Sequence, residues 1–248
     1  MDVVLVIIGD EILTGSTVDS NGGWLAQRLD GLGHRVSRIV VVGDDVDAIG
    51  ETVADALRRA PIVITTGGLG PTHDDRTTES LARAFGRALV VDAEGLATLE
   101  KRYRERGLEP NEAARRMVTV PEGSLILRNP KGSALGYVLR ENDRRVLVLP
   151  GVPAEMRAIF DSAVAGVILG DERGDRIVVE AVVYHPESAF SAELGRVAQA
   201  HPAVAIGSYP KAGEKRVVVR FRGGKAEAER ARDEFLAALG TLDAEPRA

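Results

Sequence analysis

Residues 62–75 read Ile-Val-Ile-Thr-Thr-Gly-Gly-Leu-Gly-Pro-Thr-His-Asp-Asp, and this stretch decides the fold. Its apolar, β-branched start is typical of a strand buried on both faces, and a helix pattern follows it. Three glycines between them, Gly67, Gly68 and Gly70, let backbone N–H groups turn toward a bound anion. Turns of this kind lie at the carboxyl edge of a parallel sheet, where ligands of such folds bind.

The chain on both sides of this stretch repeats the alternation of strand and helix. Apolar runs at 3–8 and 36–42 predict two more strands, and apolar residues at helical spacing predict helices over 19–32 and 46–57. Short links between alternating strands and helices predict right-handed βαβ units, hence a three-layer α/β/α fold with a mostly parallel sheet. Further helices are expected over 75–85, 93–107, 111–117 and 154–169, and further strands over 125–127, 134–139 and 146–149.

A polar, glycine-bearing stretch at 170–175 predicts a domain boundary. Residues 1–170 would then form the α/β domain and residues 171–248 a second, smaller domain. In the smaller one the pattern predicts a strand over 177–184, a helix over 187–200, strands over 203–208 and 216–221, and a helix over 226–239. This βαββα order is that of a small α+β unit.

Composition excludes several classes of protein. The 248 residues carry a formal net charge of −5, which argues against a protein whose main partner is nucleic acid. Cysteine is absent, which excludes disulfides, zinc–thiolate sites and iron–sulfur clusters. No apolar run approaches the roughly 20 residues of a membrane helix, so we expect a cytoplasmic protein without a membrane partner. Three of the four histidines, His34, His185 and His201, are expected at the surface or as helix caps.

Acidic turns follow each of the first three predicted strands. Asp10 and Glu11 follow the first, Asp44 the second, and Asp74 and Asp75 the third. Carboxylates beside an anion cradle would repel a phosphate unless a cation intervenes, and Mg²⁺ takes one or two carboxylates plus phosphate oxygens. We therefore predict a divalent metal, Mg²⁺, Mn²⁺ or Co²⁺, held by Asp74 and Asp75 with Asp10 or Glu11. Each carboxylate alone could equally cap a helix, so we base this prediction on the occurrence of acidic turns after all three strands.

Two later loops supply further candidates. Lys131 could neutralise a phosphate, or could be a solvated residue of a hairpin turn. Glu155 could orient a water, or could stand in the first turn of its helix only because a carboxylate is favoured there. The residues predicted to bind a ligand or its phosphate are Thr66, Gly67, Gly68, Gly70, Pro71, Thr72, Asn129, Gly132, Ser133 and Gly151, and secondary candidates are Asp44, Asn21, His73 and Thr77.

The order of these motifs resembles the CinA family, the homologues of competence/damage-inducible protein A. The motifs are Gly9-Asp10-Glu11 with Gly15, Asp19 and Asn21; Thr66 to Thr72 with Asp74, Asp75 and Thr77; Asn129 with Gly132; and Pro150-Gly151-Val152-Pro153 with Glu155-Met156. The same stretch is similar to the wider molybdopterin-binding domain of the MoaB/MogA/gephyrin type. Leu135 departs from this pattern, because family members have a proline there.

The resemblance implies the three-layer fold over residues 2–169 and a KH-like domain after it. It also implies metal-dependent hydrolysis of the pyrophosphate in ADP-ribose or a related nucleotide, with Asp74, Asp75, Lys131 and Glu155 as catalytic residues. The MoaB/MogA branch implies instead molybdopterin binding or adenylyl transfer in molybdenum cofactor synthesis, and a non-catalytic nucleotide-binding module is a third reading. On the same resemblance we expect a homo-oligomer, either a dimer or a trimer.

Overall fold

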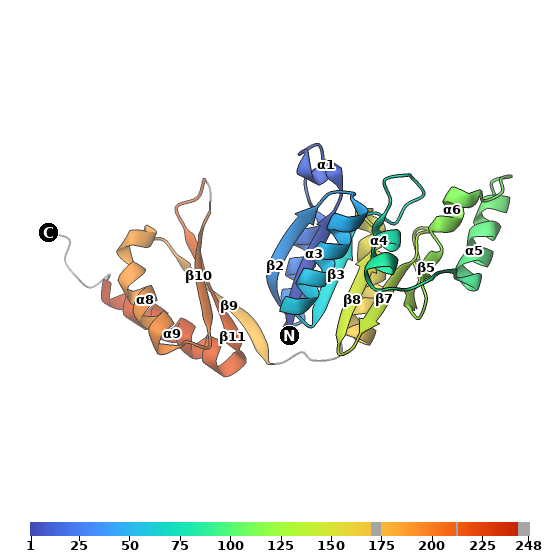
Figure 1. Cartoon of the computed structure of the whole chain (residues 1–248). Coiled ribbons are helices and arrows are strands. Elements are labelled where there is room, and N and C mark those ends of the chain that lie inside the picture. The colour runs from blue at the N-terminus through green and yellow to red at the C-terminus, as the bar shows by residue number, and fades with distance from the viewer. Residues whose placement is uncertain (170–174, 212, 243–248) are drawn as a thin grey trace. The chain divides into compact units, whose positions relative to one another are not determined.

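The computed structural model describes residues 1–169, 175–211 and 213–242, and the chain divides into two compact units, Met1–Asp171 and Glu172–Ala248 (Figure 1). Each unit has its own apolar core. None of the helices within the described residues is both long enough and apolar enough to cross a membrane.

A six-stranded sheet in the order β2-β1-β3-β8-β7-β6 forms the centre of the first unit. The strands are β1 (Asp2–Ile8), β2 (Arg35–Val42), β3 (Ile62–Thr66), β6 (Leu125–Leu127), β7 (Gly136–Glu141) and β8 (Arg144–Leu149). β2, β1, β3 and β8 pair in parallel, whereas β7 pairs antiparallel with both β8 and β6. The prediction of a mostly parallel sheet is confirmed.

Both faces of this sheet are buried, which explains why β1 is apolar along its whole length. Its even-numbered residues 4–8 belong to one apolar core and its odd-numbered residues 3–7 to another. Helices α3 (Val46–Arg59) and α4 (Thr77–Ala84), in front of the sheet in Figure 1, cover the first core. Helices α2 (Asn21–Gly31) and α7 (Pro153–Ile159) cover the second. The three-layer α/β/α architecture is therefore confirmed.

Several elements of this unit differ from prediction. A short helix, α1 (Asp10–Leu13), and a two-stranded antiparallel sheet of β4 (Leu89–Val91) and β5 (Thr119–Pro121) were not predicted, because three or four residues are too few to show a period. The helix predicted over 154–169 is α7 followed by a π-helical stretch, η1 (Phe160–Ile168). Helices α5 (Ala93–Arg104) and α6 (Glu112–Arg116) lie where they were predicted.

The second unit is an antiparallel sheet of three strands in the order β10-β11-β9, with helices packed against it. Its elements are β9 (Arg176–Val183), the 3₁₀ turn η2 (Glu187–Ala189), α8 (Ser191–Ala200), β10 (Ala205–Pro210), β11 (Val217–Gly224) and α9 (Lys225–Leu242). Its core contains Phe190, Phe221 and Phe235. The predicted order βαββα is confirmed, with a 3₁₀ turn in place of the start of the first helix.

A place at the surface or at a helix cap was predicted for three histidines, and His201 is the C-cap of α8. Exposure at the surface, however, is wrong for two of them. His34, which follows α2, and His201, which follows α8, are both buried. His201 lies between two glutamates of α9, and its neighbours in the sequence, Ala200 and Pro202, form no pattern that would have indicated this contact.

Candidate functional site

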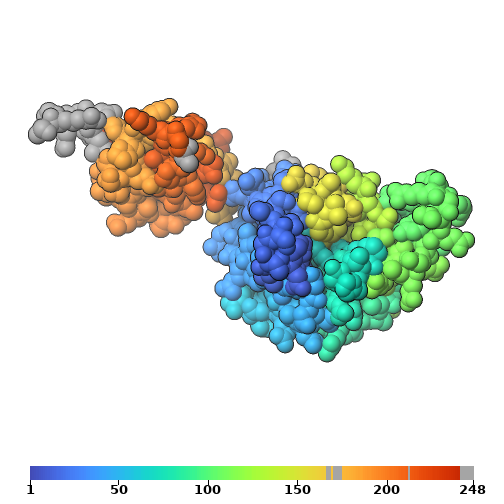
Figure 2. All heavy atoms as spheres, turned by 90° about the horizontal axis from the view of Figure 1, so that it is seen from above, coloured from blue at the N-terminus to red at the C-terminus, as the bar shows by residue number. Residues whose placement is uncertain are grey.

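A cavity of about 550 Å³ lies at the carboxyl edge of the parallel strands. Its lining comes mainly from the ends of four strands: β1 (residues 8, 9 and 11), β2 (residue 44), β3 (residues 67–71, 74 and 75) and β8 (residues 150–152 and 155). Met117, Ser133 and Ala134 complete the wall. Figure 2 looks down on this edge, where dark blue, teal and yellow segments of the first unit come together. The predicted meeting of turns from several strands therefore takes place in the structure.

The predicted site residues divide into two groups at this cavity. Those in its lining are Glu11, Asp44, Gly67, Gly68, Gly70, Pro71, Asp74, Asp75, Ser133, Gly151 and Glu155. Those outside its lining are Asp10, Asn21, Thr66, Thr72, His73, Thr77, Asn129, Lys131 and Gly132. Several members of the second group hold the first in place through hydrogen bonds.

The glycine loop after β3 depends on the absence of side chains. Gly67 has a φ of 115°, and a Cβ there would lie 2.1 Å from the carbonyl oxygen of Ile8. Thr77, at the start of α4, donates its hydroxyl to the carbonyl of Gly67 at 2.8 Å and its N–H to that of Gly68 at 3.2 Å. In the described structure, the N–H groups of residues 68–70 donate to no protein acceptor. These three donors form a cradle suited to an anion.

Asn21 fastens the ends of β3 and β8 together beneath the cavity. Its side-chain amide donates to the Thr66 hydroxyl at 3.0 Å and to the Gly151 carbonyl at 2.8 Å, and Thr66 in turn donates to the Pro150 carbonyl at 2.9 Å. Asp19, two residues earlier, accepts from the N–H groups of Asn21 and Gly22, each at 2.9 Å, and so satisfies two donors in the first turn of α2. Asn21 thus has a structural role, since it links the ends of β3 and β8. Its position at the start of a helix in the sequence did not indicate these two contacts.

Four carboxylates at this edge, which we call the acidic rim, have no described lysine or arginine partner: Asp10, Glu11, Asp44 and Asp74. Asp10 and Asp44 bond each other's backbone: Asp10 N–H donates to Asp44 Oδ2 at 2.9 Å and Asp44 N–H to Asp10 Oδ1 at 3.3 Å. The pKa of Asp44 is raised, first by burial and then by the charges of Asp10, Glu11 and Asp74, although the Asp10 hydrogen bond lowers it. Mutual repulsion of this kind favours a cation between the carboxylates.

The rim is not a complete metal site in itself. The described residues contain no group of three or more histidine, aspartate or glutamate side chains arranged to hold a metal ion. Asp75 is already engaged, since its Oδ2 accepts from the Thr72 N–H at 2.9 Å and from the Thr72 hydroxyl. A divalent metal at this edge would therefore need further ligands from a bound phosphate, and the metal stays a prediction.

Among the described residues, no lysine, arginine or histidine lines the cavity. Lys131 is exposed and outside the lining, and His73 is almost wholly exposed, with its ring 3.9 Å from Asp74. Arg102 of α5 instead contacts the loop of Lys131 from outside, donating to the carbonyl of Gly132. In place of basic side chains, the lining offers an anion backbone N–H groups and the hydroxyl of Ser133.

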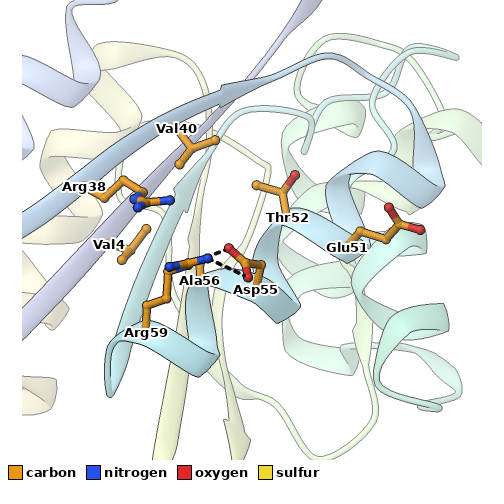
Figure 3. A pocket seen from close by; sticks show the side chains of 8 residues that line it. All are labelled: Val4, Arg38, Val40, Glu51, Thr52, Asp55, Ala56 and Arg59. Atoms are coloured by element: carbon orange, nitrogen blue, oxygen red, sulfur yellow. Dashed lines mark hydrogen bonds and ion pairs between the residues drawn. The ribbon is translucent and has the colours of Figure 1, made fainter.

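A second, smaller hollow of about 290 Å³ lies between β2 and α3 (Figure 3). Its carboxylate Asp55 accepts from Arg59 at 2.7 Å and from Arg58 at 2.9 Å, and Figure 3 shows the Arg59 contact. The hydrogen bond from Arg59 is the first cause of the lowered pKa of Asp55. This carboxylate is therefore already neutralised by arginine, unlike Glu11 and Glu155 of the larger cavity.

Comparison with known proteins assigns a family to this geometry. Residues 4–169 match the family model described as a probable molybdopterin binding domain, and residues 178–245 match the model of the FAD synthase middle domain. A protein of Aeropyrum pernix is 39% identical over 95% of this chain and 90% of its own length. A CinA-like protein of Gemmatimonas aurantiaca is 42% identical over 80% of this chain, and one of Myxococcus xanthus is 39% identical over 84%.

A solved structure adds to this agreement. The crystal structure titled as the protein CinA with unknown function from Thermoplasma acidophilum matches 65% of this chain and 94% of its own, with 35% identity and a TM-score of 0.61. This chain spans 48% and 51% of the lengths of the two CinA-like proteins. The chain belongs to the family of probable molybdopterin-binding domains and corresponds, within it, to the N-terminal part of CinA-like proteins.

Proposed function

We propose that this protein is a nucleotide pyrophosphohydrolase that requires a divalent metal and acts on ADP-ribose or a related nucleotide. One observation carries the proposal: unshared backbone donors and unpaired carboxylates meet in a single cavity, and its described lining contains no basic side chain. The donors suit phosphate oxygens, whereas the carboxylates would repel them. A ligand that enters with its own divalent cation satisfies both.

The rim residues fit such a cation. Asp74 and Glu11 line the cavity, and no described arginine or lysine pairs with them. Burial is the first cause of the raised pKa of the neighbouring Asp44, and the charges of Asp10, Glu11 and Asp74 add to it. The pKa of Asp74 is lowered, first by a hydrogen bond from Thr72, which favours its ionised form. When bound there, a divalent metal would offset phosphate charge and lower the pKa of an attacking water.

The chain's own residues would do the positioning. The N–H groups of residues 68–70 would donate to phosphate oxygens, where preorganised donors stabilise developing negative charge. Asp75 acts through the loop, because its hydrogen bonds from Thr72 fix the turn that follows the cradle. Lys131 lies outside the lining, so the role predicted for it in offsetting phosphate charge has no support from the geometry.

The test is hydrolysis of ADP-ribose by the purified protein with Mg²⁺, Mn²⁺ or Co²⁺. We expect AMP and ribose 5-phosphate to form only when metal is present, and the rate to fall about 100-fold in Asp74→Asn. Asp47→Asn is the matched control, because Asp47 is an exposed carboxylate paired with Arg83 outside the cavity. Absence of turnover with all three metals, in protein shown to be folded, would overturn the proposal.

A second candidate is binding of molybdopterin, with or without adenylyl transfer. The family description favours it, and so does the apolar part of the wall, where Ile8, Leu69 and Met117 could contact a flat ring. Its phosphate would occupy the same cradle. Binding of a pterin phosphate without any hydrolysis of ADP-ribose would favour this second function over the first.

A further inference from the structure

Glu155, in the first turn of α7, brings a carboxylate without a cationic partner into the cavity. Its Oε2 accepts a hydrogen bond from the side-chain amide of Asn129 at 2.6 Å. Within the described part of the chain, no arginine, lysine or histidine nitrogen lies within 4.0 Å of it. An ionised carboxylate has about four acceptor positions. One neutral donor therefore leaves this half-buried group with both charge and acceptor capacity to spare.

The position of this carboxylate is fixed by its surroundings. Asn129 Oδ1 accepts from the N–H groups of Lys131 at 3.0 Å and Gly132 at 2.8 Å, and its Nδ2 also donates to the Ala134 carbonyl at 2.9 Å. These partners determine which end of the amide faces Glu155, so Asn129 must present a donor there. A Cβ on Gly132 would lie 2.1 Å from the Glu155 carboxyl carbon. The loop is therefore shaped around the carboxylate.

The cavity thus has two kinds of wall with opposite chemistry. The N–H groups of residues 68–70 donate hydrogen bonds and attract anions, whereas Glu155 accepts hydrogen bonds and repels them. A ligand that contacts both must carry an anionic group and, apart from it, hydrogen-bond donors. Two carboxylate oxygens are matched best by two adjacent donors on the ligand.

We propose that Glu155 determines specificity by accepting hydrogen bonds from two adjacent donors of the ligand. Two chemical sources present such a pair: the vicinal hydroxyls of a ribose, and the ring N–H with the neighbouring amino group of a 2-amino-4-oxopyrimidine ring, as in guanine or a pterin. The inference rests on the proposed function only in using the same cavity, and it requires no hydrolysis.

The experiment compares the affinities of three nucleotides by isothermal titration calorimetry, with Mg²⁺ and again with EDTA. ADP offers the ribose hydroxyls, 2′-deoxy-ADP offers neither donor pair, and 2′-deoxy-GDP offers only the ring pair. We expect 2′-deoxy-ADP to bind about 10-fold more weakly than whichever of the other two carries the recognised pair. A preference for ADP identifies the ribose, and a preference for 2′-deoxy-GDP identifies the ring.

Variants show whether Glu155 is the source of the preference. Glu155→Gln keeps an oxygen for Asn129 but turns an amino group toward the ligand, so the 10-fold preference should disappear while the fold is kept. Gly132→Ala should weaken the preference as well, because it displaces a carboxylate that is still present. Glu51→Gln, on the exposed side of α3, is the matched control and should leave the preference unchanged.

Two results would overturn the inference: equal binding of all three nucleotides, including no binding of any, or a preference that persists in Glu155→Gln. Neither depends on ADP-ribose turnover. Failure of the hydrolysis assay would therefore leave this comparison intact, and failure of this comparison would leave the pyrophosphohydrolase proposal standing.

Discussion

The carboxylates at the carboxyl edge of the first unit and those of the second unit differ in whether a basic side chain pairs with them. At the edge, Glu11 and Glu155 line a cavity without a basic partner in the described structure. In the second unit, Glu180 bonds Arg220 at 2.8 Å and Glu227 bonds His201 at 2.8 Å. Paired charges stabilise a fold modestly, whereas unpaired charges in a cavity are available to a ligand. Whether a carboxylate has a basic partner therefore distinguishes one that stabilises the fold from one that is available to bind a ligand.

The largest effect that we expect comes from adding one methyl group to the cradle. Gly67→Ala combines a φ of 115° with a Cβ 2.1 Å from the Ile8 carbonyl oxygen, so the loop must move. The free energy of unfolding should fall by more than about 3 kcal/mol, measured by urea denaturation.

Gly15→Ala is the control for this variant. Gly15 has a φ of 75° but nothing lies within 4 Å of its added Cβ, so only the strain of a positive φ remains, about 1 kcal/mol. Equal losses in the two variants would mean that the close approach of β1 and β3 at the cradle does not constrain the structure.

The cradle is also the part of the site that the sequence predicted best. Gly67, Gly68 and Gly70 follow an apolar strand, and that local pattern contains both the strand and the turn. The three-layer fold could be predicted for the same reason, since alternating apolar runs are local signals.

What could not be predicted depends on contacts between residues distant in sequence. Asn21 meets Gly151 across 130 positions, and Asn129 meets Glu155 across 26. The sequence placed Lys131 in the site because of its charge, but the residue is exposed and does not line the cavity. Type and spacing of residues thus predict which turns meet, whereas the direction of each side chain follows only from tertiary packing.

An intermediate effect is expected in the second unit, at His201. Its ring nitrogens lie 2.9 Å from Glu234 and 2.8 Å from Glu227, and these hydrogen bonds, that of Glu234 first, raise the pKa of the histidine above its ordinary value of 6.5. The protonated form therefore stabilises the fold. This contribution is complete below pH 6.5 and is lost as the pH rises through the raised pKa.

The measurement is the melting temperature of the whole protein between pH 5.5 and about pH 9. We expect it to fall by a few degrees as the pH rises and the fall to be smaller in His201→Gln. The carboxylates that face the ring are Glu227 and Glu234. The hydrogen bond from His201 lowers the pKa of Glu227, so this carboxylate keeps its charge while the histidine titrates. A melting temperature with the same pH dependence in the variant would contradict the assignment.

The smallest effect belongs to a paired charge at the surface, and it gives the sharpest contrast with Glu155. Arg220 bonds Glu180 at 2.8 Å and lies 5.1 Å above the ring of Tyr209, with both charged side chains about half exposed. A double-mutant cycle of Arg220→Gln and Glu180→Gln should give a coupling of about 0.5 kcal/mol that weakens in high salt, with nucleotide binding unchanged.

Glu155→Gln should do the reverse, because no ion pair is lost when an unpaired carboxylate is neutralised: stability should hold or rise while ligand preference disappears. If Glu155→Gln destabilised the protein more than Arg220→Gln and left binding unchanged, its carboxylate would be structural. The absence of a basic partner would then no longer distinguish a binding residue from one that supports the fold.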